Sequence, residues 1–377
     1  MYVHIPFCRS RCRYCGFVSN PYDPGTVSDY VRALKKEIEL LRTRTDLFPT
    51  WPCVVDSVYF GGGTPSLPAP AHVERILEAV YEGFEVLDDA EISIEVNPST
   101  ADVTAMRRLG AIGFNRAGLG LQSLHDEELR RMGRTHTAVE GLRAFHNLRE
   151  SGFSNISTDL IGGYPGQTLD SFGRSLEEII KLRPEHISFY LLEVKDGTPL
   201  SVDIRRGAES LPDDDLAADM YEFLCERAVN AGYVHYEIAN FAQPGCECRH
   251  NLKYWSDVPF FGLGSGAHGF TGRYRYANHD KLEDYFQALE YGRLPLASLN
   301  ESSPEQRLRD ALIMGLRRVG GLDLGALGRE YDADVRSFVV QTIGHLADAE
   351  LYTMQGDHIR LTPRGLLLSN VIFGCWV

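Results

Sequence analysis

No apolar run in the 377-residue sequence approaches the roughly 20 residues that a membrane-spanning helix needs. Positive charge is also scarce, because 38 lysine and arginine residues face 52 aspartate and glutamate residues, which leaves a net charge of −14. This deficit argues against a broad electrostatic surface for nucleic acid. We also find no signal peptide, low-complexity tract or solenoid repeat. The sequence therefore predicts a cytoplasmic globular protein that does not bind nucleic acid.

Cysteine is sparse too, yet three of the eight cysteines stand within the first fifteen residues. Cys8, Cys12 and Cys15 have the spacing C-x3-C-x2-C. Iron–sulfur clusters are normally held by four thiolates, so three would leave one iron open, and an open metal position is typical of a catalytic site. The alternative is a zinc site with His4 as fourth ligand, which would be strained within a predicted strand. The other five cysteines are scattered, which suits a reducing compartment.

Strand-like and helix-like segments alternate through the first half of the chain. Apolar, β-branched runs occupy residues 2–7, 56–62, 91–96, 114–123, 156–163 and 186–193. Helix-like segments between them include 28–43, with Ser28 as the expected N-cap, 70–84 and 168–183. This alternation predicts βαβ units and a parallel sheet. The predicted fold class is α/β, a partial (β/α)6 TIM-like barrel whose active site lies at the C-terminal ends of the strands.

The composition changes twice after this barrel. We predict a partial barrel over residues 1–195, a barrel extension over 196–299 and a small, mainly helical, winged-helix-like domain over 300–377. The last domain is predicted from a helix–turn–helix pattern at 305–331, followed by a short hairpin and a final helix. Because it is not strongly basic, we expect it to pack or to bind a partner rather than to bind DNA.

Several polar motifs follow the predicted strands. The glycines of GGGTPS, at 61–66, allow the backbone to approach a ligand closely, and Thr64 could contact a charged amino acid group. Glu95 could bind an ammonium group or ribose hydroxyls, and Arg134 could hold a carboxylate in a bidentate fork. Gln122 and Asp159 stand at similar strand ends. Taken singly, each residue is more often an ordinary surface or capping residue, but together they could line one cavity.

A second motif, HNLKYW, occupies residues 250–255. Its histidine, His250, could ligate heme iron or another metal, while Tyr254 and Trp255 could present flat faces to a porphyrin. The alternative interpretation is a buried histidine beside core aromatic residues. From the residues alone both interpretations stay open.

The motifs together resemble one branch of a known superfamily. YVHIPFCRSRCRYCGF, YFGGGTPS, IEVNP, GLGLQS and HNLKYW with GLGSGAHG resemble the coproporphyrinogen oxidase-like branch of radical S-adenosylmethionine (SAM) proteins, over essentially the whole chain. Within it the sequence is most similar to the HemW heme chaperones, whose HNxxYW signature it matches fully. Phe17 stands where oxygen-independent coproporphyrinogen III oxidases carry a fourth cysteine. Gly16 departs from the aspartate common in the chaperones.

The resemblance implies a radical SAM type of partial barrel and a set of site residues. The [4Fe–4S] cluster would be bound by Cys8, Cys12 and Cys15. The cluster-bound SAM would contact Tyr2, Gly62 and Glu95. The positions that match a second SAM site are Tyr14, Gly63, Thr64, Gln122, Arg134 and Asp159. Heme binding would involve His250, supported by Asn251, Tyr254 and Trp255.

The function that the resemblance implies is a heme chaperone that binds the cluster, SAM and heme and delivers heme to apo-hemoproteins. An electron donor would be a further partner, any membrane contact would come through a partner, and a homodimer is a further hypothesis. Whether SAM is cleaved productively stays open. The alternatives are a class C radical SAM methyltransferase or cyclopropanase using two SAM molecules, an oxygen-independent coproporphyrinogen III oxidase, and a non-catalytic scaffold with the C-terminal domain as adaptor.

Overall fold

The computed structural model describes residues 1–48, 53–211 and 213–377. They form two compact units, one of residues 1–224 with 259–300 and the other of residues 225–258 with 301–377. The HNLKYW segment therefore clusters with the C-terminal part of the chain. The three-part division at residues 195 and 299 stays a prediction. Among the described residues, no helix combines the length and the apolar character needed to cross a membrane.

Seven strands of the main sheet belong to the first unit, in the order β11-β1-β4-β5-β6-β7-β8, and every neighbouring pair among them is parallel. These strands are β1 (Tyr2–Ile5), β4 (Val54–Gly62), β5 (Glu85–Val96), β6 (Arg116–Gln122), β7 (Ile156–Gly162), β8 (His186–Leu191) and β11 (Gly262–Leu263). All six predicted strand runs are confirmed. The α/β class and the parallel sheet are confirmed with them.

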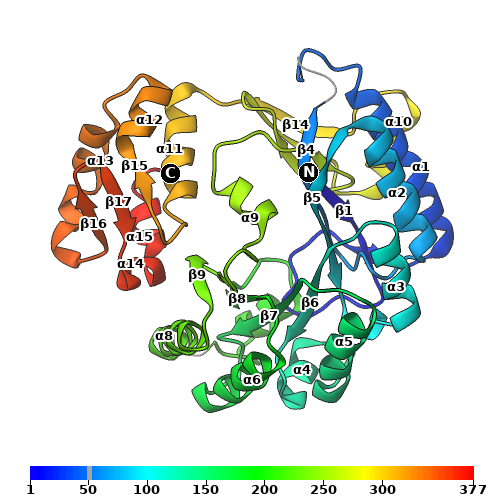
Figure 1. The fold of residues 1–377 in the computed structure, drawn as a ribbon, viewed down its shortest axis with the longest axis horizontal. Helices are drawn as coiled ribbons and strands as arrows, with labels where there is room; N and C mark the ends of the chain where they lie inside the picture. The colour runs from blue at the N-terminus through cyan, green and yellow to red at the C-terminus, as the bar shows by residue number, and fades with distance from the viewer. Residues whose placement is uncertain (49–52, 212) are drawn as a thin grey trace. The chain divides into compact units, whose positions relative to one another are not determined.

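Helices cover the outer side of this sheet, as Figure 1 shows for α1 to α6. The helices of the first unit are α1 (Pro24–Leu41), α2 (Pro70–Gly83), α3 (Val103–Ala111), α4 (Asp126–Met132), α5 (Ala138–Glu150), α6 (Leu169–Leu182), α7 (Pro199–Arg205) and α10 (Leu282–Glu290). A short 3-10 helix, η1, spans Pro98–Thr100, and α8 (Asp214–Asn230) runs from the first unit into the second.

Smaller strands complete the first unit. The pair β2 (Phe7–Cys8) and β3 (Asn20–Pro21) is parallel, and a separate three-stranded sheet contains β12 (His268–Phe270), β13 (Tyr274–Asn278) and β14 (Leu296–Glu301). The β2–β3 pair closes the segment that carries the three N-terminal cysteines.

Alternation along the strands separates an apolar face from a polar one, because successive side chains point to opposite sides of a sheet. Phe60, Ile94 and Leu119 are fully buried, and the Phe60 ring packs edge-on against Phe114. Tyr59 is next to Phe60 on β4, and Glu95 is next to Ile94 on β5. These two residues hydrogen-bond to each other on the other face of the sheet. The sheet thus packs its core on the helix side and keeps polar groups for the interior.

The predicted start of the first helix is wrong. The helix begins at Pro24, and the Asp23 side chain accepts a hydrogen bond from the Thr26 backbone N–H at 2.8 Å, whereas Ser28 lies inside the helix and donates to the Pro24 carbonyl. Aspartate is as good an N-cap as serine, and proline is favoured at the first helical position. The prediction for 168–183 is confirmed, since Thr168 and Ser171 form a capping box at the start of α6.

The second unit is mainly helical. Its helices are α9 (Arg249–Tyr254), α11 (Pro304–Gly315), α12 (Leu324–Tyr331), α13 (Val335–Ile343), the 3-10 helix η2 (Gly344–Ala349), α14 (Pro363–Leu367) and α15 (Ser369–Phe373). Its strands are β9 (Val234–Glu237), β10 (Asn240–Ala242), β15 (Leu322–Asp323), β16 (Tyr352–Gln355) and β17 (His358–Leu361). The hairpin β16–β17 pairs with β15, which confirms the winged-helix-like prediction, whereas the single final helix is wrong because two short helices replace it.

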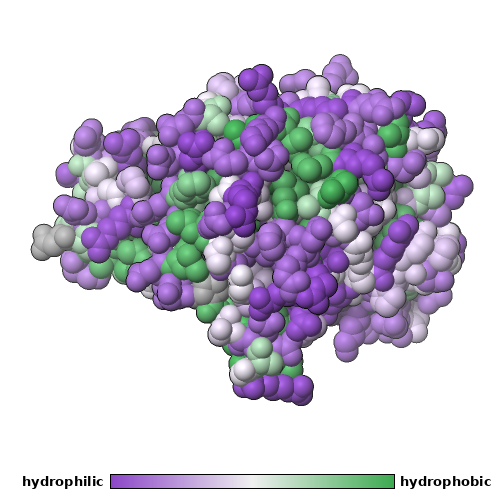
Figure 2. Space-filling view, turned by 90° about the horizontal axis from the view of Figure 1, so that it is seen from below, coloured by the Kyte–Doolittle hydropathy of each residue, from purple (hydrophilic) through white to green (hydrophobic). Residues whose placement is uncertain are grey.

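Polar side chains cover most of the face in Figure 2, and apolar residues gather on it only in limited areas. Large exposed apolar side chains such as Phe17, Val139 and Tyr291 lie far apart along the chain. Scattered exposure of this kind is usual for globular proteins.

Candidate functional site

The three N-terminal cysteines lie on one loop that leaves the sheet after β1. All three are partly buried free thiols, and the Cys15 backbone N–H donates to the Cys12 carbonyl at 3.2 Å. The β2–β3 pairing joins Cys8 to Pro21 and fixes both ends of the loop. A short, pinned loop of this kind can present three sulfur atoms on one side.

Two polar side chains from other loops, Thr64 after β4 and Arg134 after α4, reach these sulfur atoms. The Thr64 hydroxyl donates to Cys8 Sγ at 3.5 Å, and Arg134 Nη1 donates to Cys12 Sγ at 3.6 Å. Burial raises the pKa of Cys8 and Cys15, and the charge of the neighbouring Cys12 raises both further. No group of three or more His, Cys, Asp or Glu side chains lies in metal-ligand geometry in the described part of the chain. The donor set nevertheless suits an iron–sulfur cluster, whose thiolates accept hydrogen bonds that tune them.

His4 is occupied by other groups, which weakens the zinc alternative. Its Nδ1 is hydrogen-bonded to the Tyr2 hydroxyl at 2.9 Å, and its Nε2 to the Val18 carbonyl at 2.8 Å. Both ring nitrogens are therefore engaged, and burial lowers the pKa of His4. The ring ties strand β1 to the far end of the cysteine loop.

The glycine motif crosses the cysteine loop at very close range. Gly63 N–H donates to the Ile5 carbonyl at 3.0 Å, and Thr64 N–H donates to the Phe7 carbonyl at 2.8 Å. A Cβ on Gly63 would lie 2.8 Å from both the backbone N and O of Phe7, which cannot move without breaking this contact. Gly62 has φ +109, a left-handed conformation that favours glycine. The motif therefore places backbone rather than side chain beside the cysteines.

Glu95 and Asp159 place two carboxyl groups on the polar face of the sheet. Glu95 accepts hydrogen bonds from Gly62 N–H and from the Tyr59 hydroxyl, both at 3.0 Å. Burial raises the pKa of Glu95 to about 7, and the charge of Asp159 adds to this rise. Burial likewise raises the pKa of Asp159 to about 6, against a hydrogen bond from Ser188. Two nearby carboxyl groups that ionise with difficulty are suited to a cationic ligand group.

Gln122 and Arg134 meet at the end of β6. Gln122 has φ +70, the left-handed region that non-glycine residues seldom adopt, and such strain is typical of functional sites. Arg134 Nη2 donates to the Gly120 carbonyl, and a Cβ on Gly120 would lie 3.0 Å from Gln122 Nε2. Arg134 Nε is buried without a hydrogen-bond partner. This unsatisfied donor fits the carboxylate that was predicted for Arg134.

Tyr14 places its hydroxyl beside Cys12 and Arg134 at the cysteine loop. Its ring lies edge-on to Tyr164, with ring centroids 6.2 Å apart, and contacts the buried cluster around Leu200. The pKa of Tyr14 is raised by burial. The structure thus brings Cys8 to Thr64, Cys12 to Arg134 and Gly62 to Glu95. Tyr59 is a site residue that the sequence analysis missed, although its alternation with Gly61 along β4 would have placed both on one face.

The HNLKYW segment forms helix α9 in the second unit. His250 Nε2 is hydrogen-bonded to the Tyr254 hydroxyl at 3.0 Å, and the two rings stand nearly perpendicular, with centroids 5.0 Å apart. The spacing of four residues brings them onto one helix face. His250 is buried, and burial is the main cause that lowers its pKa well below the ordinary value. Positive charges, which include Lys253, lower this pKa further. A neutral imidazole of this kind is the form that ligates iron. Asn251 is partly exposed.

Trp255 contacts Arg317, which follows α11. The guanidinium carbon of Arg317 lies 5.1 Å from the Trp255 ring centroid and 5.3 Å from that of Phe373. One face of the indole ring is therefore covered by a cation.

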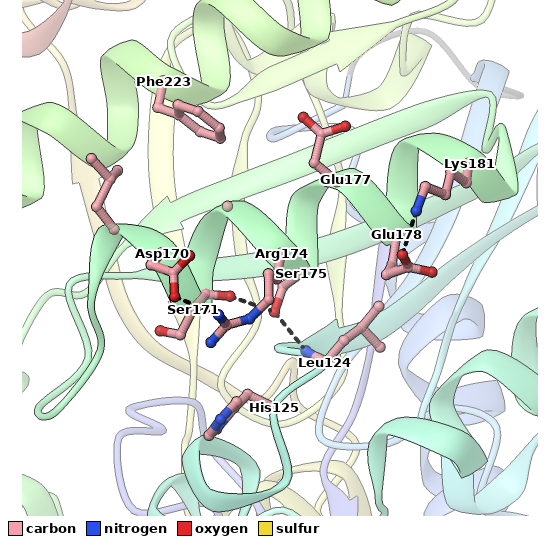
Figure 3. Close-up of a pocket in the computed structure, with 12 residues that line it drawn as sticks. Leu124, His125, Asp170, Ser171, Arg174, Ser175, Glu177, Glu178, Lys181 and Phe223 are labelled. Atoms are coloured by element: carbon pink, nitrogen blue, oxygen red, sulfur yellow. Dashed lines mark hydrogen bonds and ion pairs between the residues drawn. The ribbon is translucent and has the colours of Figure 1, made fainter.

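A separate cavity of about 790 Å³ lies on the outer side of the first unit. Residues of α6 line this cavity together with His125, which precedes α4, and Phe223 of α8 (Figure 3). Four of its charged side chains form ion pairs, Arg174 with Asp170 and Lys181 with Glu178. None of the predicted site residues lines this cavity.

Comparison with known proteins gives two family matches and several full-length relatives. The radical SAM superfamily matches residues 2–179, and the HemN C-terminal domain matches residues 302–368. A protein named heme chaperone HemW from Mycobacterium tuberculosis is 35% identical over 377 residues, which cover 99% of this chain and 93% of that protein. A protein of the same name from Bacillus subtilis is 30% identical, with 100% and 98% covered.

A solved structure supports the same relationship. The coproporphyrinogen III oxidase (HemN) from Escherichia coli, described as a radical SAM enzyme, aligns with a TM-score of 0.85 and 25% identity. The alignment covers 100% of this chain and 89% of that chain.

Proposed function

Because the chain belongs to the HemW family within the radical SAM superfamily, we propose that it is a heme chaperone that binds heme and delivers it to apo-hemoproteins. One observation carries the proposal: the neutral, buried His250 of HNLKYW occurs in the same chain as a pinned loop of three free thiols. The first supplies an iron ligand for heme, and the second supplies the ligands of a cluster.

The family implies a [4Fe–4S] cluster and SAM. Cys8, Cys12 and Cys15 would hold the cluster, with Thr64 and Arg134 donating hydrogen bonds to two of the sulfur atoms. When bound, the cluster supplies the electron that cleaves SAM in this superfamily. An electron donor would then have to return an electron to the cluster.

SAM would be held by groups of both charges. Glu95 would accept hydrogen bonds from a cationic or hydroxyl group while Gly62 and Tyr59 orient its carboxyl. Tyr2 of β1 is hydrogen-bonded to His4, and its ring stacks against Tyr59. Arg134 would bind a carboxylate through its unsatisfied Nε. Gly63, Thr64, Gln122, Asp159 and Tyr14 complete the set proposed around a second SAM. Their roles are proposals that rest on the family match.

Heme would be ligated by His250, with Asn251, Tyr254 and Trp255 around it. His250 is poised for this role because burial keeps it uncharged, so no proton has to leave before iron binds. A homodimer, and contact with a membrane through a partner, stay hypotheses, as does the delivery of heme to particular acceptors.

The fold likeness to the oxidase favours one second candidate, oxygen-independent coproporphyrinogen decarboxylation. The observation against it is Phe17, a largely exposed side chain where that enzyme carries a fourth cysteine. Cluster-reconstituted protein supplied with coproporphyrinogen, SAM and a reductant under anaerobic conditions should give no protoporphyrinogen. Formation of that product would replace the chaperone proposal by the oxidase.

The test of the primary proposal is an anaerobic heme titration of cluster-reconstituted protein, followed by visible absorption. His250→Ala should lose stoichiometric binding while keeping its iron–sulfur content. His358→Ala is the matched control, because His358 is an exposed histidine of β17 in the same unit. Equal heme binding by His250→Ala and the unchanged protein would reject the role of His250, and no specific binding by the unchanged protein would reject the chaperone.

A further inference from the structure

Arg317 is held in a fixed place within the second unit, yet no carboxylate of the described residues forms an ion pair with it. Its guanidinium carbon lies over the rings of both Trp255 and Phe373, at 5.1 and 5.3 Å from their centroids. Two cation–π contacts restrain the plane of the group. Arg317 is partly buried, and the charge of Glu237 acts on it without an ion pair between the two. The group is therefore positioned but not neutralised.

Glu237 is the acidic residue whose charge acts on Arg317, but its carboxyl is hydrogen-bonded to other groups. Glu237 is buried, and its carboxyl accepts hydrogen bonds from Asn240 Nδ2 and from the Ala239 backbone N–H at 3.3 Å. Burial raises the pKa of Glu237 to about 7, so this carboxyl carries only part of a charge near neutral pH. It does not satisfy Arg317.

Two buried donors remain unsatisfied at this place. Trp255 Nε1 and Arg317 Nε are both buried N–H groups without a hydrogen-bond partner in the described structure. An unpaired buried donor costs free energy, so native structures usually retain one only where water, an ion or a ligand pairs with it. Two such donors on residues in contact would both be satisfied by one group with two acceptor oxygens.

We propose that Trp255 and Arg317 form a carboxylate-binding subsite beside the HNLKYW helix, and that the group it receives is a propionate of heme. Arginine binds carboxylates through two N–H groups in one plane, and the indole N–H adds a donor at the edge. This inference rests on the proposed heme-binding function. It assigns the porphyrin's acidic edge to the C-terminal domain and its iron to His250.

Neighbouring contacts hold the subsite in shape. Asp257, two residues after Trp255, accepts a hydrogen bond from Arg307 Nη2 at 2.8 Å and another from the Tyr331 hydroxyl. The Arg317 carbonyl accepts from the Ile238 N–H at 3.0 Å. The segment after α9 is thus anchored to α11 and α12, and the donors are arranged before any ligand arrives. Such preorganisation reduces the entropy lost on binding.

The test compares heme with heme dimethyl ester, in which both propionates lack charge. The cluster-reconstituted full chain should bind heme more tightly than the ester by roughly 10- to 100-fold, as for a charge-assisted hydrogen bond. In Arg317→Met, whose side chain can still pack against the two rings, this ratio should fall to about one. Arg317→Lys should restore part of the ratio, and Trp255→Phe should lower it by a smaller factor.

The matched control is Arg318→Met, since Arg318 is the next residue, is exposed and carries the same charge. It should keep the ratio of the unchanged protein. A ratio of one in the unchanged protein, or an equal ratio in Arg317→Met and Arg318→Met, overturns the subsite while leaving the chaperone proposal intact. If the unchanged protein binds neither compound, the chaperone proposal fails and the subsite fails with it. Because the ratio compares two ligands on one variant, general loss of stability does not change it.

Discussion

Removing the hydroxyl of Tyr254 should strengthen heme binding. In the structure this hydroxyl is hydrogen-bonded to His250 Nε2 at 3.0 Å, and we expect heme iron to bind at this nitrogen. Iron can reach the nitrogen only after that hydrogen bond breaks. Tyr254→Phe removes the bond from the free protein but keeps the ring that stands at 84° to the imidazole.

The size of the effect follows from the net value of one hydrogen bond. A hydrogen bond between neutral groups contributes about 1 kcal/mol to stability, so heme binding to the unchanged protein must offset this loss. Tyr254→Phe has no such bond to break. We therefore expect the dissociation constant for heme to fall about fivefold. The rate of association should rise with it, because the imidazole no longer has to exchange partners first.

The assay is the anaerobic heme titration, with stopped-flow absorption for the association rate. Tyr352→Phe is the matched control, since its hydroxyl donates a hydrogen bond to the Ile343 carbonyl at 3.4 Å in the same unit. That variant should leave both quantities unchanged. Weaker heme binding by Tyr254→Phe would refute the reasoning, because it would mean that the hydroxyl stabilises the bound state rather than the free one.

Three further predictions concern the first unit. Gly63→Ala should lose most of its cluster iron, because the added methyl lies 2.8 Å from two Phe7 backbone atoms, whereas Gly110→Ala, with no atom within 4 Å, should keep it; equal iron contents would contradict this. SAM affinity, measured by calorimetry, should rise as the pH passes about 7 and Glu95 ionises, and Glu95→Gln should show a flat profile. Burial raises the pKa of Glu37 to about 7, so its contribution to the free energy of unfolding is fully present below pH 4.5, its ordinary pKa, and is lost as the pH rises through 7. In denaturant unfolding, the free energy of unfolding of Glu37→Gln should therefore fall less over this pH range than that of the unchanged protein. An equal fall in both proteins would reject Glu37 as the source.

The barrel could be predicted because its strands carry their own signal. Runs such as 91–96 and 156–163 combine β-branched residues with flanking helix patterns, and local pattern is enough for such elements. The helix start at residue 24 was missed because Asp23 and Ser28 are both good caps, and only the tertiary structure shows which one ends the coil. Element identity was thus predictable where its boundary was not.

The candidate site divides in a similar way. Cysteine spacing and glycine runs are visible in the sequence, so Cys8, Gly63 and Glu95 could be proposed in advance, although their roles remain proposals. The contact of Trp255 with Arg317 could not, because the two residues are 62 positions apart and Arg317 belongs to an ordinary basic pair directly after a helix. Such long-range partners depend on packing, for which a single sequence has no local signal.

The chain passes between its two compact units at residues 224, 258 and 300. Neither unit can therefore be released by a single cut. A protein ending at residue 300 would keep the HNLKYW letters but lose Arg307, Arg317 and Tyr331, and residues 225–258 would be left without the helices that anchor Trp255 and Asp257. Loss of heme binding after such a truncation would report a collapsed support and not a missing ligand, so point substitutions are the sound way to dissect this molecule.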